Sequence, residues 1–402
     1  MLTDTRTGQP DSRSSETTEP VLSIVIPCLN EADTIGTCIE KALRALATLP
    51  VAGEIVVGDN GSTDGSQAIC ERLGARVVPI AERGYGNALM GGIAAARGKY
   101  VIMGDADDSY DFLEIPKFYE KLADGYDIVQ GCRLPSGGGT VLPGAMPPLH
   151  RWIGNPMFSM MVKYWFHAPI HDVYCGMRGF TKAHYETLNQ RCVGMEFATE
   201  MIIKSSLFGA KFAEVPITLH PDGRKAHAPH LRTFRDGWRT LRFFLLYSPR
   251  WLFLIPGLAL IALGLLGYVI ALPGMTFGHV TFDVHTLLFA SLFILLGYQS
   301  VIFAIFAKTF GVSEGLMPED KRLSRFYEII DLEKGIAIGG AMLAVGIVLL
   351  IDAILQWRAV SFGRLDYAHT MRWVIPGATL TALGYQTVIS SFLVSTVGLR
   401  RK

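Results

Sequence analysis

The chain has 402 residues, of which 50% are hydrophobic and 18% are charged, and its formal net charge is +1. That length allows two or three domains, and the apolar share is high for a water-soluble protein of this size. A nucleic-acid binder normally carries a strongly basic domain, so the charge argues against nucleic acid as a partner. The six cysteines form no C-x-x-C pair and no zinc-binding spacing, which favours free thiols in a reducing compartment.

The first part of the chain predicts an α/β domain. Residues 1–20 are rich in Thr, Ser, Pro and charged side chains and lack the apolar core of a signal peptide, so they predict a disordered tail. Short β-branched runs then alternate with segments whose apolar residues recur at helical spacing. The predicted strands cover 21–26, 54–58, 75–80 and 100–104, and the predicted helices include 31–49 and 88–97. This alternation favours a mostly parallel sheet with functional loops at the carboxyl ends of its strands.

The end of this domain, predicted to cover 21–250, carries segments of a different kind. The Gly- and Pro-rich stretch at 133–148 predicts a mobile loop. About 150–168 is apolar and aromatic, and about 231–247 has arginines on one helical face with aromatic and leucine side chains on another. The residues that define the second pattern are Arg232, Arg235, Arg239 and Arg242 against Phe234, Trp238, Leu241 and Leu245. Both stretches predict helices at a membrane surface, with packing on the domain's own core as the alternative.

Residues 251–402 predict an all-α transmembrane domain. Four apolar runs are long enough to cross a bilayer, at about 251–272, 285–307, 335–356 and 373–397, and Asp352 is the clear charged exception within them. The loop 308–334 and the end of the chain are rich in Lys and Arg, whereas the other two loops carry none and three basic residues. The positive-inside rule therefore places the N-terminal domain and the C-terminus in the cytoplasm, in a multi-pass protein of the cytoplasmic membrane. Buried helices of a large soluble protein are the alternative.

Three acidic turns follow predicted strands. Asp105-Ala106-Asp107 follows the fourth strand, and two carboxylates spaced in this way can share one Mg²⁺ or Mn²⁺ that bridges a pyrophosphate, although a lone pair also fits a solvated turn. Ile26-Pro27-Cys28-Leu29-Asn30-Glu31 closes the first strand, and Asp59-Asn60-Gly61-Ser62-Thr63-Asp64 closes the second. In a parallel sheet the three turns are expected to converge on one crevice. There Asp59 could accept a hydrogen bond from a nucleobase N–H.

These motifs, with Gly84-Tyr85-Gly86-Asn87-Ala88, resemble the family-2 glycosyltransferases of the GT-A fold. Gly131-Cys132-Arg133, Cys175-Gly176-Met177-Arg178-Gly179-Phe180 and the C-terminal apolar runs narrow the resemblance to the dolichyl- and polyprenyl-phosphate mannose and glucose synthases. The resemblance covers nearly all of 21–250 in sequence and the four apolar runs in architecture. It implies a Rossmann-like GT-A catalytic domain followed by a membrane domain.

The resemblance also implies roles for individual residues. Those for the nucleotide are Pro27, Leu29, Glu31, Asp59 and Asp105, and the metal ligands are Asp105 and Asp107. Those for the acceptor phosphate are Arg133, Arg151, Arg224 and Lys225, of which the last two stand in a segment that departs from the family's usual Gly-Glu-Ser-Lys. Ser109 stands where a third metal ligand, usually Gln, is found in the mannose synthases. Arg178 belongs to the Gly-Phe motif, Glu200 to the acidic helix after it, and Asp108 could tune the site.

The implied reaction is the inverting transfer of a hexose from a nucleotide sugar to a polyprenyl phosphate at the membrane. A phosphate monoester is already anionic near neutral pH, so it can attack the anomeric carbon without a strong base. UDP-glucose is the favoured donor, and GDP-mannose is the alternative. A processive polysaccharide synthase is a further alternative, although the Gln of its acceptor motif is missing before Arg151-Trp152. A non-catalytic membrane scaffold and a homo-oligomeric state are left open.

Overall fold

The computed structural model describes residues 19–224, 233–329 and 331–398, without the side chains of 233–236, 322, 326, 328, 329, 397 and 398. Most of the predicted N-terminal tail, and with it Lys225 and Arg232, lies outside the described residues. The chain divides into two compact units. The sheet unit contains Met1–Pro156, Ile170–Ala198 and Ala210–Pro229, and the helical unit contains Met157–Pro169, Thr199–Gly209 and His230–Lys402.

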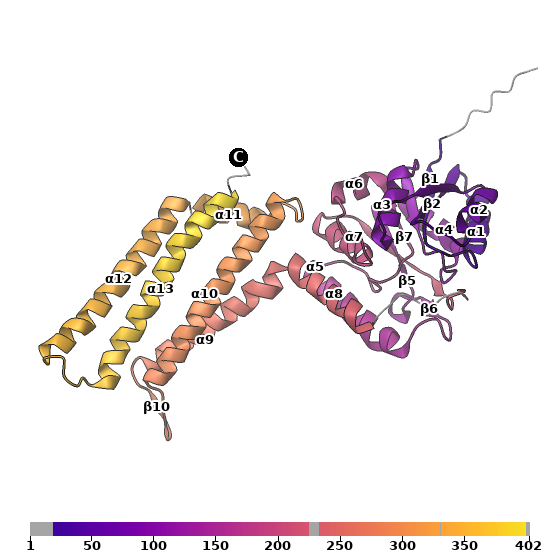
Figure 1. Ribbon diagram of the computed structural model, residues 1–402. Coiled ribbons are helices and arrows are strands. Elements are labelled where there is room, and N and C mark those ends of the chain that lie inside the picture. Colours follow the sequence, from indigo (N-terminus) through magenta and orange to yellow (C-terminus); the bar gives the residue numbers. More distant parts are fainter. Residues whose placement is uncertain (1–18, 225–232, 330, 399–402) are drawn as a thin grey trace, which may run out of the picture. The chain divides into compact units, whose positions relative to one another are not determined.

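The sheet unit is built on seven strands in the order β3-β2-β1-β4-β7-β5-β8 (Figure 1). They are β1 (Leu22–Cys28), β2 (Gly53–Asp59), β3 (Arg76–Pro79), β4 (Tyr100–Met103), β5 (Ile128–Cys132), β7 (Arg178–Thr181) and β8 (Phe212–Pro216). All neighbours are parallel except β7, which runs antiparallel to both β4 and β5. Every residue of β1 is buried, as expected for a strand covered on both faces. The mostly parallel sheet predicted from the sequence is confirmed.

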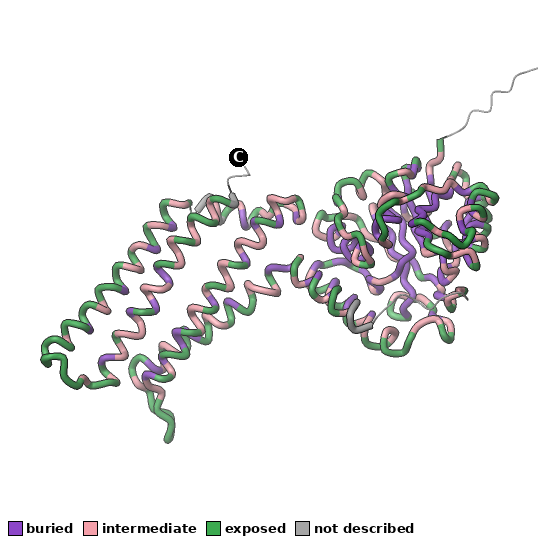
Figure 2. Tube along the Cα trace, viewed as in Figure 1, coloured by how far each residue is buried: buried purple, intermediate pink, exposed green. Residues whose placement is uncertain are grey.

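Helices cover this sheet and bury their apolar stripes against it. They are α1 (Ile35–Ala47), α2 (Ser66–Arg72), α3 (Tyr85–Ala95), α4 (Ile115–Ala123) and α6 (Lys182–Leu188), with a short 3-10 turn η1 (Phe112–Glu114). The positions of α1 that were predicted to be apolar and inward, including Ile35, Ile39 and Ala42, are buried. Figure 2 shows that buried residues in this unit concentrate along the strands. The core therefore fixes the strand ends, where the acidic turns begin.

The Gly- and Pro-rich stretch holds little regular secondary structure, as predicted, and its mobility remains a prediction. A 3-10 turn, η2 (Pro135–Gly137), leads into β6 (Thr140–Val141), which pairs in parallel with β9 (Thr218–Leu219). The backbone N–H of Thr140 donates to Ile217 and that of Leu142 to Leu219. The stretch is therefore tied to the segment that follows β8, because its backbone groups find partners there.

The helical unit contains four long helices that lie side by side in the order α12, α13, α10 and α9 (Figure 1). The helices of this part of the chain are α5 (Asn155–Phe166), α7 (Glu196–Leu207), α8 (Thr233–Tyr247), α9 (Ile255–Ala271), α10 (Val284–Ser313), α11 (Lys321–Ile329), α12 (Leu332–Ala359) and α13 (Tyr367–Gly398). Two π-turns, η3 (His150–Gly154) and η4 (Arg250–Leu254), precede α5 and α9, and a hairpin of β10 (Thr276–Phe277) and β11 (Val280–Thr281) joins α9 to α10.

Three of the described helical segments are long and apolar enough to cross a membrane: Arg250–Ala271, Val284–Ser313 and Leu332–Ala359. Few of their residues are buried, and Figure 2 colours most of the long helices as exposed or intermediate. They coincide with three of the four predicted runs. The fourth run lies in α13, which has the length of a span and contains Pro376 and several polar residues. A span in α13 therefore remains a prediction.

Small residues and hydroxyl groups hold the long helices together. A methyl group added at Gly257 of α9 would lie 2.8 Å from the carbonyl oxygen of Gly297 of α10, so the two backbones approach closely. The Tyr268 hydroxyl lies 2.6 Å from the hydroxyl oxygen of Ser291 and donates to Thr379 over 3.2 Å, linking α9, α10 and α13. Asp352 is exposed on α12 and accepts a hydrogen bond from Gln356.

The two predicted surface helices correspond to α5 and α8, which pack on each other through aromatic rings. Phe244 of α8 is fully buried, with its ring centroid 5.8 Å from Phe158 and 5.9 Å from Phe166 of α5. Trp238 and Arg239 of α8 are exposed, whereas Phe244, which the sequence pattern does not single out, carries the packing. A membrane-surface position for α5 and α8 remains a prediction.

Candidate active site

The three acidic turns emerge from adjacent strands. β2, β1 and β4 are neighbours, and Cys28 at the end of β1 is in register with Asp59 at the end of β2. The first two turns are bonded to each other, because Asn30 donates its backbone N–H to the Ser62 hydroxyl over 2.9 Å and its Oδ1 accepts the Thr63 N–H over 2.8 Å. The predicted convergence at one edge of the sheet is therefore present.

Asp59 presents two very different carboxylate oxygens. Its Oδ2 accepts from the backbone N–H groups of Gly61 and Ser62 and from Gln67 Nε2, over 2.9, 3.0 and 2.6 Å. Its Oδ1 is buried and has no hydrogen-bond partner among the described residues. A buried carboxylate oxygen without a donor is costly, so this atom suits a ligand N–H. Pro27 is buried on the adjacent strand end and Leu29 is exposed beside it.

Asp105 is the first carboxylate of the Asp-Ala-Asp turn that follows β4. The Tyr85 hydroxyl donates to its Oδ1 over 2.9 Å. Burial, together with the charge of Asp107, raises the pKa of Asp105 to about 6, against the lowering effect of the Tyr85 hydrogen bond. A methyl group added at Gly176 would lie 2.5 Å from Oδ2, so only glycine leaves that oxygen its room. Tyr85 was not assigned a role from the sequence, although it stands in the Gly-Tyr-Gly-Asn motif.

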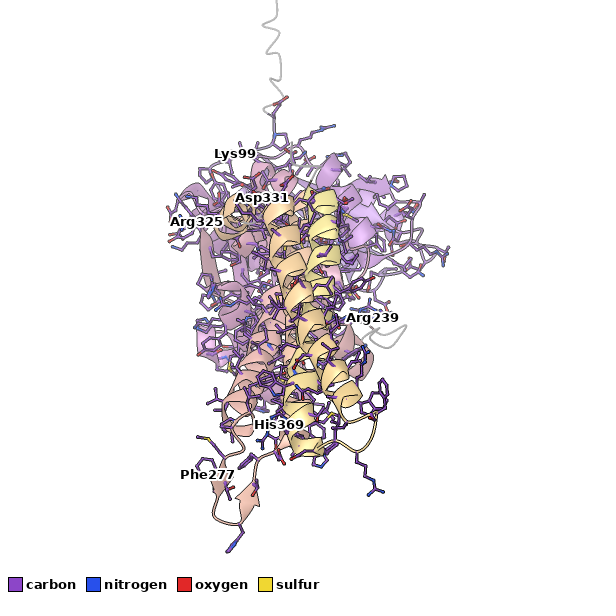
Figure 3. All side chains as sticks on the ribbon, turned by 90° about the vertical axis from the view of Figure 1, so that its left-hand side faces the viewer. Lys99, Arg239, Phe277, Arg325, Asp331 and His369 are labelled. Atoms are coloured by element: carbon purple, nitrogen blue, oxygen red, sulfur yellow. The ribbon has the colours of Figure 1, made fainter. Side chains whose placement is uncertain are left out.

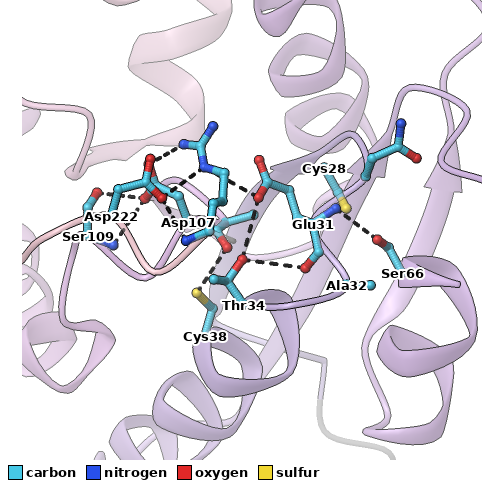
Figure 4. A network of polar contacts seen from close by, with 12 residues as sticks. Cys28, Glu31, Ala32, Thr34, Cys38, Ser66, Asp107, Ser109 and Asp222 are labelled. Atoms are coloured by element: carbon cyan, nitrogen blue, oxygen red, sulfur yellow. Dashed lines mark hydrogen bonds and ion pairs between the residues drawn. The ribbon is translucent and has the colours of Figure 1, made fainter. Parts of the chain in front are cut away.

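Asp107 is fully engaged on both carboxylate oxygens (Figure 4). Oδ1 accepts the backbone N–H of Ser109 over 3.0 Å and its hydroxyl over 2.6 Å. Oδ2 accepts Arg224 Nη2 over 2.5 Å. Arg224 also pairs with Asp222 over 3.1 Å and Glu31 over 3.6 Å. Although burial disfavours its charge, Asp107 and Glu31 raise the pKa of Arg224. Arg224, assigned above to the acceptor phosphate, thus contacts the proposed metal ligand and a nucleotide-site residue.

The chemistry of these ligands fits a divalent ion that is shared with a ligand. Asp105 and Asp107 supply hard oxygens two residues apart at a strand end. No group of three or more His, Cys, Asp or Glu side chains within the described residues could hold a metal alone. Further ligands would therefore have to come from the substrate or from water. Ser109 uses its hydroxyl hydrogen on Asp107, so it orients that carboxylate.

Asp108 is turned away from this pair. Its backbone has a positive φ of 57°, and its Oδ1 accepts Lys41 Nζ over 2.8 Å. Lys41 belongs to α1. The structure therefore ties Asp108 to a helix and does not bring its carboxylate into a recorded contact with Asp105 or Asp107.

Arg133 is held in a buried ion pair. Its Nε and Nη2 donate to the two carboxylate oxygens of Asp172 over 2.7 and 2.9 Å, and its Nη1 donates to the Tyr110 hydroxyl over 3.3 Å. Although burial disfavours its charge, Asp172 raises the pKa of Arg133. Glu214 in turn accepts the backbone N–H groups of His171 and Asp172 over 2.7 and 3.3 Å. The sequence offered no signal for Asp172, because it lies 39 positions from its partner.

The remaining predicted cations and acids make other contacts. Arg151 sits in η3 with its guanidinium 5.0 Å from the Trp152 ring centroid, and its Nε is buried with no partner among the described residues. Arg178 is fully buried and donates to the carbonyl oxygens of Ala198 and Cys175, and burial lowers its pKa. Glu200 belongs to the helical unit, where it pairs with the equally buried Lys204 over 2.7 Å.

Comparisons with known proteins agree with this geometry. The model of glycosyl transferase family 2 matches residues 23–188, and that of the glycosyltransferase family 2 C-terminal transmembrane region matches 305–398. A low-salt glycan biosynthesis hexosyltransferase from Haloferax volcanii is 36% identical over 94% of this chain and 89% of its own length. The chain is a family-2 glycosyltransferase. A dolichyl-phosphate hexose transferase from the same organism is 31% identical over 54% of this chain and 89% of its own.

As a family-2 enzyme with a C-terminal transmembrane region, the glycosyltransferase is a membrane protein with a GT-A sheet domain. Among solved structures, a glucosyl-3-phosphoglycerate synthase from Mycobacterium tuberculosis with Mg²⁺ and UDP matches at 19% identity and a TM-score of 0.46. The match covers 57% of this chain and 79% of the synthase chain. The similarity is too distant to bear on the reaction.

In this glycosyltransferase the glycines of Gly84-Tyr85-Gly86 serve backbone packing. The N–H of Gly86 donates to the carbonyl oxygen of Val193 over 2.9 Å. A methyl group at Gly86 would lie 2.4 Å from the carbonyl oxygen of Cys192, and one at Gly84 2.5 Å from that of Val193. The motif therefore lets the loop before α7 lie against the start of α3, which carries Tyr85 to Asp105.

Proposed function

We propose that this glycosyltransferase moves a hexose from a nucleotide sugar, with UDP-glucose as the favoured donor, onto a polyprenyl phosphate, with inversion at the anomeric carbon. The observation that carries the proposal is the Asp105–Asp107 pair at the end of β4, beside the strand ends where Asp59 offers a buried, unpaired oxygen. A base N–H would satisfy that oxygen. Carboxylates two residues apart suit the diphosphate of the same donor through a shared divalent ion.

The proposed acceptor is supported by the charge of the site and by the relatives. Arg133 is kept charged inside the sheet unit by Asp172, and Arg151 retains a buried N–H without a partner among the described residues. The Arg151 guanidinium can donate to a phosphate oxygen, whereas Arg133, whose Nε, Nη1 and Nη2 donate to Asp172 and Tyr110, supplies positive charge. One relative is named dolichyl-phosphate hexose transferase, and dolichyl phosphate is a lipid phosphate. We infer that Arg133 and Arg151 bind the acceptor phosphate.

In the proposed reaction, an anionic oxygen of the lipid phosphate attacks the anomeric carbon and forms the new C–O bond. The bond from that carbon to the donor diphosphate breaks, and its electron pair leaves with the nucleoside diphosphate. Asp105 and Asp107 would hold Mg²⁺ or Mn²⁺, which when bound supplies positive charge to the leaving group. The protein's task is to position two anions and offset their charge, so no side chain has to act as a strong base.

The orientation of the enzyme in the membrane is part of the proposal. We place the sheet unit, the connection containing α11 and the C-terminus in the cytoplasm, where nucleotide sugars are made. The first support is the Lys- and Arg-rich sequence of 308–334. The second is the ion pair of Arg372 with Asp283 over 2.9 Å, because it neutralises one of the basic residues in the loops on the opposite side. Figure 3 shows Arg325 and Asp331 at one end of the long helices and Phe277 and His369 at the other.

The donor is tested by nucleotide binding to the full-length protein in detergent. We expect UDP with Mn²⁺ to raise the melting temperature more than GDP with Mn²⁺. In Asp59→Asn, the amide oxygen can take the place of Oδ2 and keep the hydrogen bonds from Gly61, Ser62 and Gln67. The amide NH₂ then takes the place of Oδ1, so that one donor faces the N–H of the base. UDP affinity should then fall about tenfold or more, because an acceptor becomes a donor. Stabilisation by GDP alone would favour GDP-mannose instead.

Product analysis separates the remaining alternative. A polyprenyl-phosphate synthase yields one hexose per lipid, which runs as a single organic-soluble species, whereas a processive polysaccharide synthase yields a water-soluble or insoluble polymer. We expect the single lipid-linked hexose. A polymer that lengthens with time would overturn the proposed acceptor while leaving the donor site intact.

A further inference from the structure

Asp107, the second proposed metal ligand, has no free carboxylate oxygen in the structure. Ser109 donates twice to Oδ1, and Arg224 Nη2 donates to Oδ2 (Figure 4). The Ser109 contacts are local, because the residue lies two positions along the same turn. The Arg224 contact is not local, since 117 positions separate the two residues. A metal ion on Oδ2 would stand where the guanidinium now lies.

Arg224 is built into this position by its own segment. The backbone N–H of Gly223 donates to the carbonyl oxygen of Asp107 over 3.0 Å, and that of His220 to the carbonyl oxygen of Ser109 over 2.9 Å. Asp222 Oδ1 accepts both the backbone N–H and the Nε of Arg224, over 2.9 and 3.1 Å. The Arg224 side chain is 14% exposed. These contacts aim the guanidinium at the carboxylates of Asp107 and Glu31.

We propose that Arg224 and the divalent ion compete for Asp107, so that the ion enters with the nucleotide diphosphate and not alone. The inference rests on the proposed function and adds an order of binding to it. A divalent ion beside a guanidinium on the same oxygen would be repelled, and Asp105 alone offers one carboxylate. The donor diphosphate brings further negative charge, which both coordinates the ion and gives the displaced Arg224 a new acceptor. Free metal is therefore bound weakly, and the metal–donor complex tightly.

The test measures Mn²⁺ binding to the full-length protein in detergent, from the electron paramagnetic resonance signal of free Mn²⁺, without and with UDP. Without UDP, Arg224→Ala should bind Mn²⁺ about tenfold more tightly than the natural protein, because a charge-assisted hydrogen bond no longer has to break. Arg224→Lys keeps the charge without the two-nitrogen fork and should fall between them. UDP should strengthen Mn²⁺ binding more in the natural protein than in Arg224→Ala.

Lys41→Ala is the matched control. Like Arg224→Ala, it removes one positive charge that contacts the turn after β4, but Lys41 lies on α1 and contacts Asp108 and not Asp107. We expect it to leave nucleotide-free Mn²⁺ affinity within about twofold of the natural protein, as for a partly exposed ion pair. An equal gain in Lys41→Ala and Arg224→Ala would mean that net charge and not competition sets the affinity, and would overturn the inference.

The outcomes also separate this inference from the proposed function. If Mn²⁺ binds with UDP in the natural protein and is lost in Asp107→Ala, the metal site stands. If the Mn²⁺ affinity without UDP is then equal in the natural protein and in Arg224→Ala, the proposed competition is wrong while the metal site is retained. If no variant binds Mn²⁺ even with UDP, both ideas fail together. Arg224→Lys guards against misfolding, because it preserves the charge that Asp107, Asp222 and Glu31 face.

Discussion

At the scale of single residues, the site is a set of anions whose charges are balanced by named cations. Arg224 lies on Asp107, Lys41 on Asp108 and Arg133 on Asp172. Among the carboxylates of the described residues, only Asp59 keeps a buried oxygen without a partner, while Asp105 has a neutral donor in Tyr85. Asp59 and Asp105, which form no ion pair with a cation of the described residues, are assigned to the donor, whereas Asp107, assigned to the donor's metal, is paired with Arg224.

The Arg133–Asp172 pair offers a prediction on stability. Asp172→Ala should cost about 3–5 kcal/mol, because removal of one partner leaves the other charge buried and uncompensated. Glu40→Gln, which removes the exposed Arg44–Glu40 pair, should change stability by less than about 1 kcal/mol. Thermal unfolding of the full-length protein measures both. Similar melting temperatures for the two variants would mean that Arg133 finds another partner or is not buried.

How far the sequence predicts such residues depends on their separation along the chain. Asp59, Asp105 and Asp107 follow β-branched runs directly, so local pattern and parallel topology placed them correctly at one sheet edge. Tyr85 and Asp172 act through partners 20 and 39 positions away, and no local pattern marks such contacts. Arg224 was assigned to the acceptor phosphate, and its partner Asp107 could not be inferred, because backbone hydrogen bonds between segments more than 100 positions apart bring the two together.

At the scale of elements, strands with uniform β-branched sequence were predictable and the others were not. β1, β2 and β4 match their predicted ranges within about two residues, which is the usual uncertainty of strand ends. β7 has the sequence Arg-Gly-Phe-Thr, which carries no such signal, yet it lies antiparallel between β4 and β5. β6 and β9 have two residues each, too few for any periodicity, so the Gly- and Pro-rich stretch looked like a free loop.

The contact between the start of α3 and the loop before α7 predicts a difference between two glycines of one helix. Gly86→Ala should expose residues 192 and 193 to hydrogen exchange, because the new methyl group meets their backbone at 2.4–3.0 Å. Gly91→Ala meets only the flexible end of the Ile80 side chain and should leave that exchange unchanged. Both substitutions replace a glycine of α3 with alanine, so the change in helix propensity is the same and does not contribute to the difference between the two variants. Unchanged exchange in Gly86→Ala would show that the loop does not depend on this packing.

At the scale of the whole molecule, a sheet unit that carries the acidic site is combined with a unit of long apolar helices. Three described segments meet the requirements of a membrane span, and the C-terminal transmembrane region of the family matches 305–398. The apolar runs could be read from the sequence because each exceeds the length that a bilayer requires. The packing of α5 on α8 was not readable, since it depends on Phe158, Phe166 and Phe244 meeting in space.

The proposed topology predicts which introduced thiols an impermeant maleimide can reach from outside intact cells. Thr276→Cys and Ser361→Cys should be labelled, and Ser313→Cys should not. Cys192→Ser provides the background, because the other five native cysteines are buried. Burial also makes these thiols poorly reactive, since it raises the pKa of Cys28 to about 11 and of Cys70 to about 12. Labelling of Ser313→Cys in sealed cells would reverse the proposed orientation or change the number of spans.

The central claim is metal-dependent transfer of a single hexose to a lipid phosphate, and one assay addresses it directly. The purified full-length protein is incubated with radiolabelled UDP-glucose, polyprenyl phosphate and Mn²⁺, and the label is followed into the organic phase. We predict a β-linked lipid-phosphate hexose that disappears with EDTA and in Asp105→Asn and Asp107→Asn. Label that still enters the lipid in EDTA and in both variants would contradict the account.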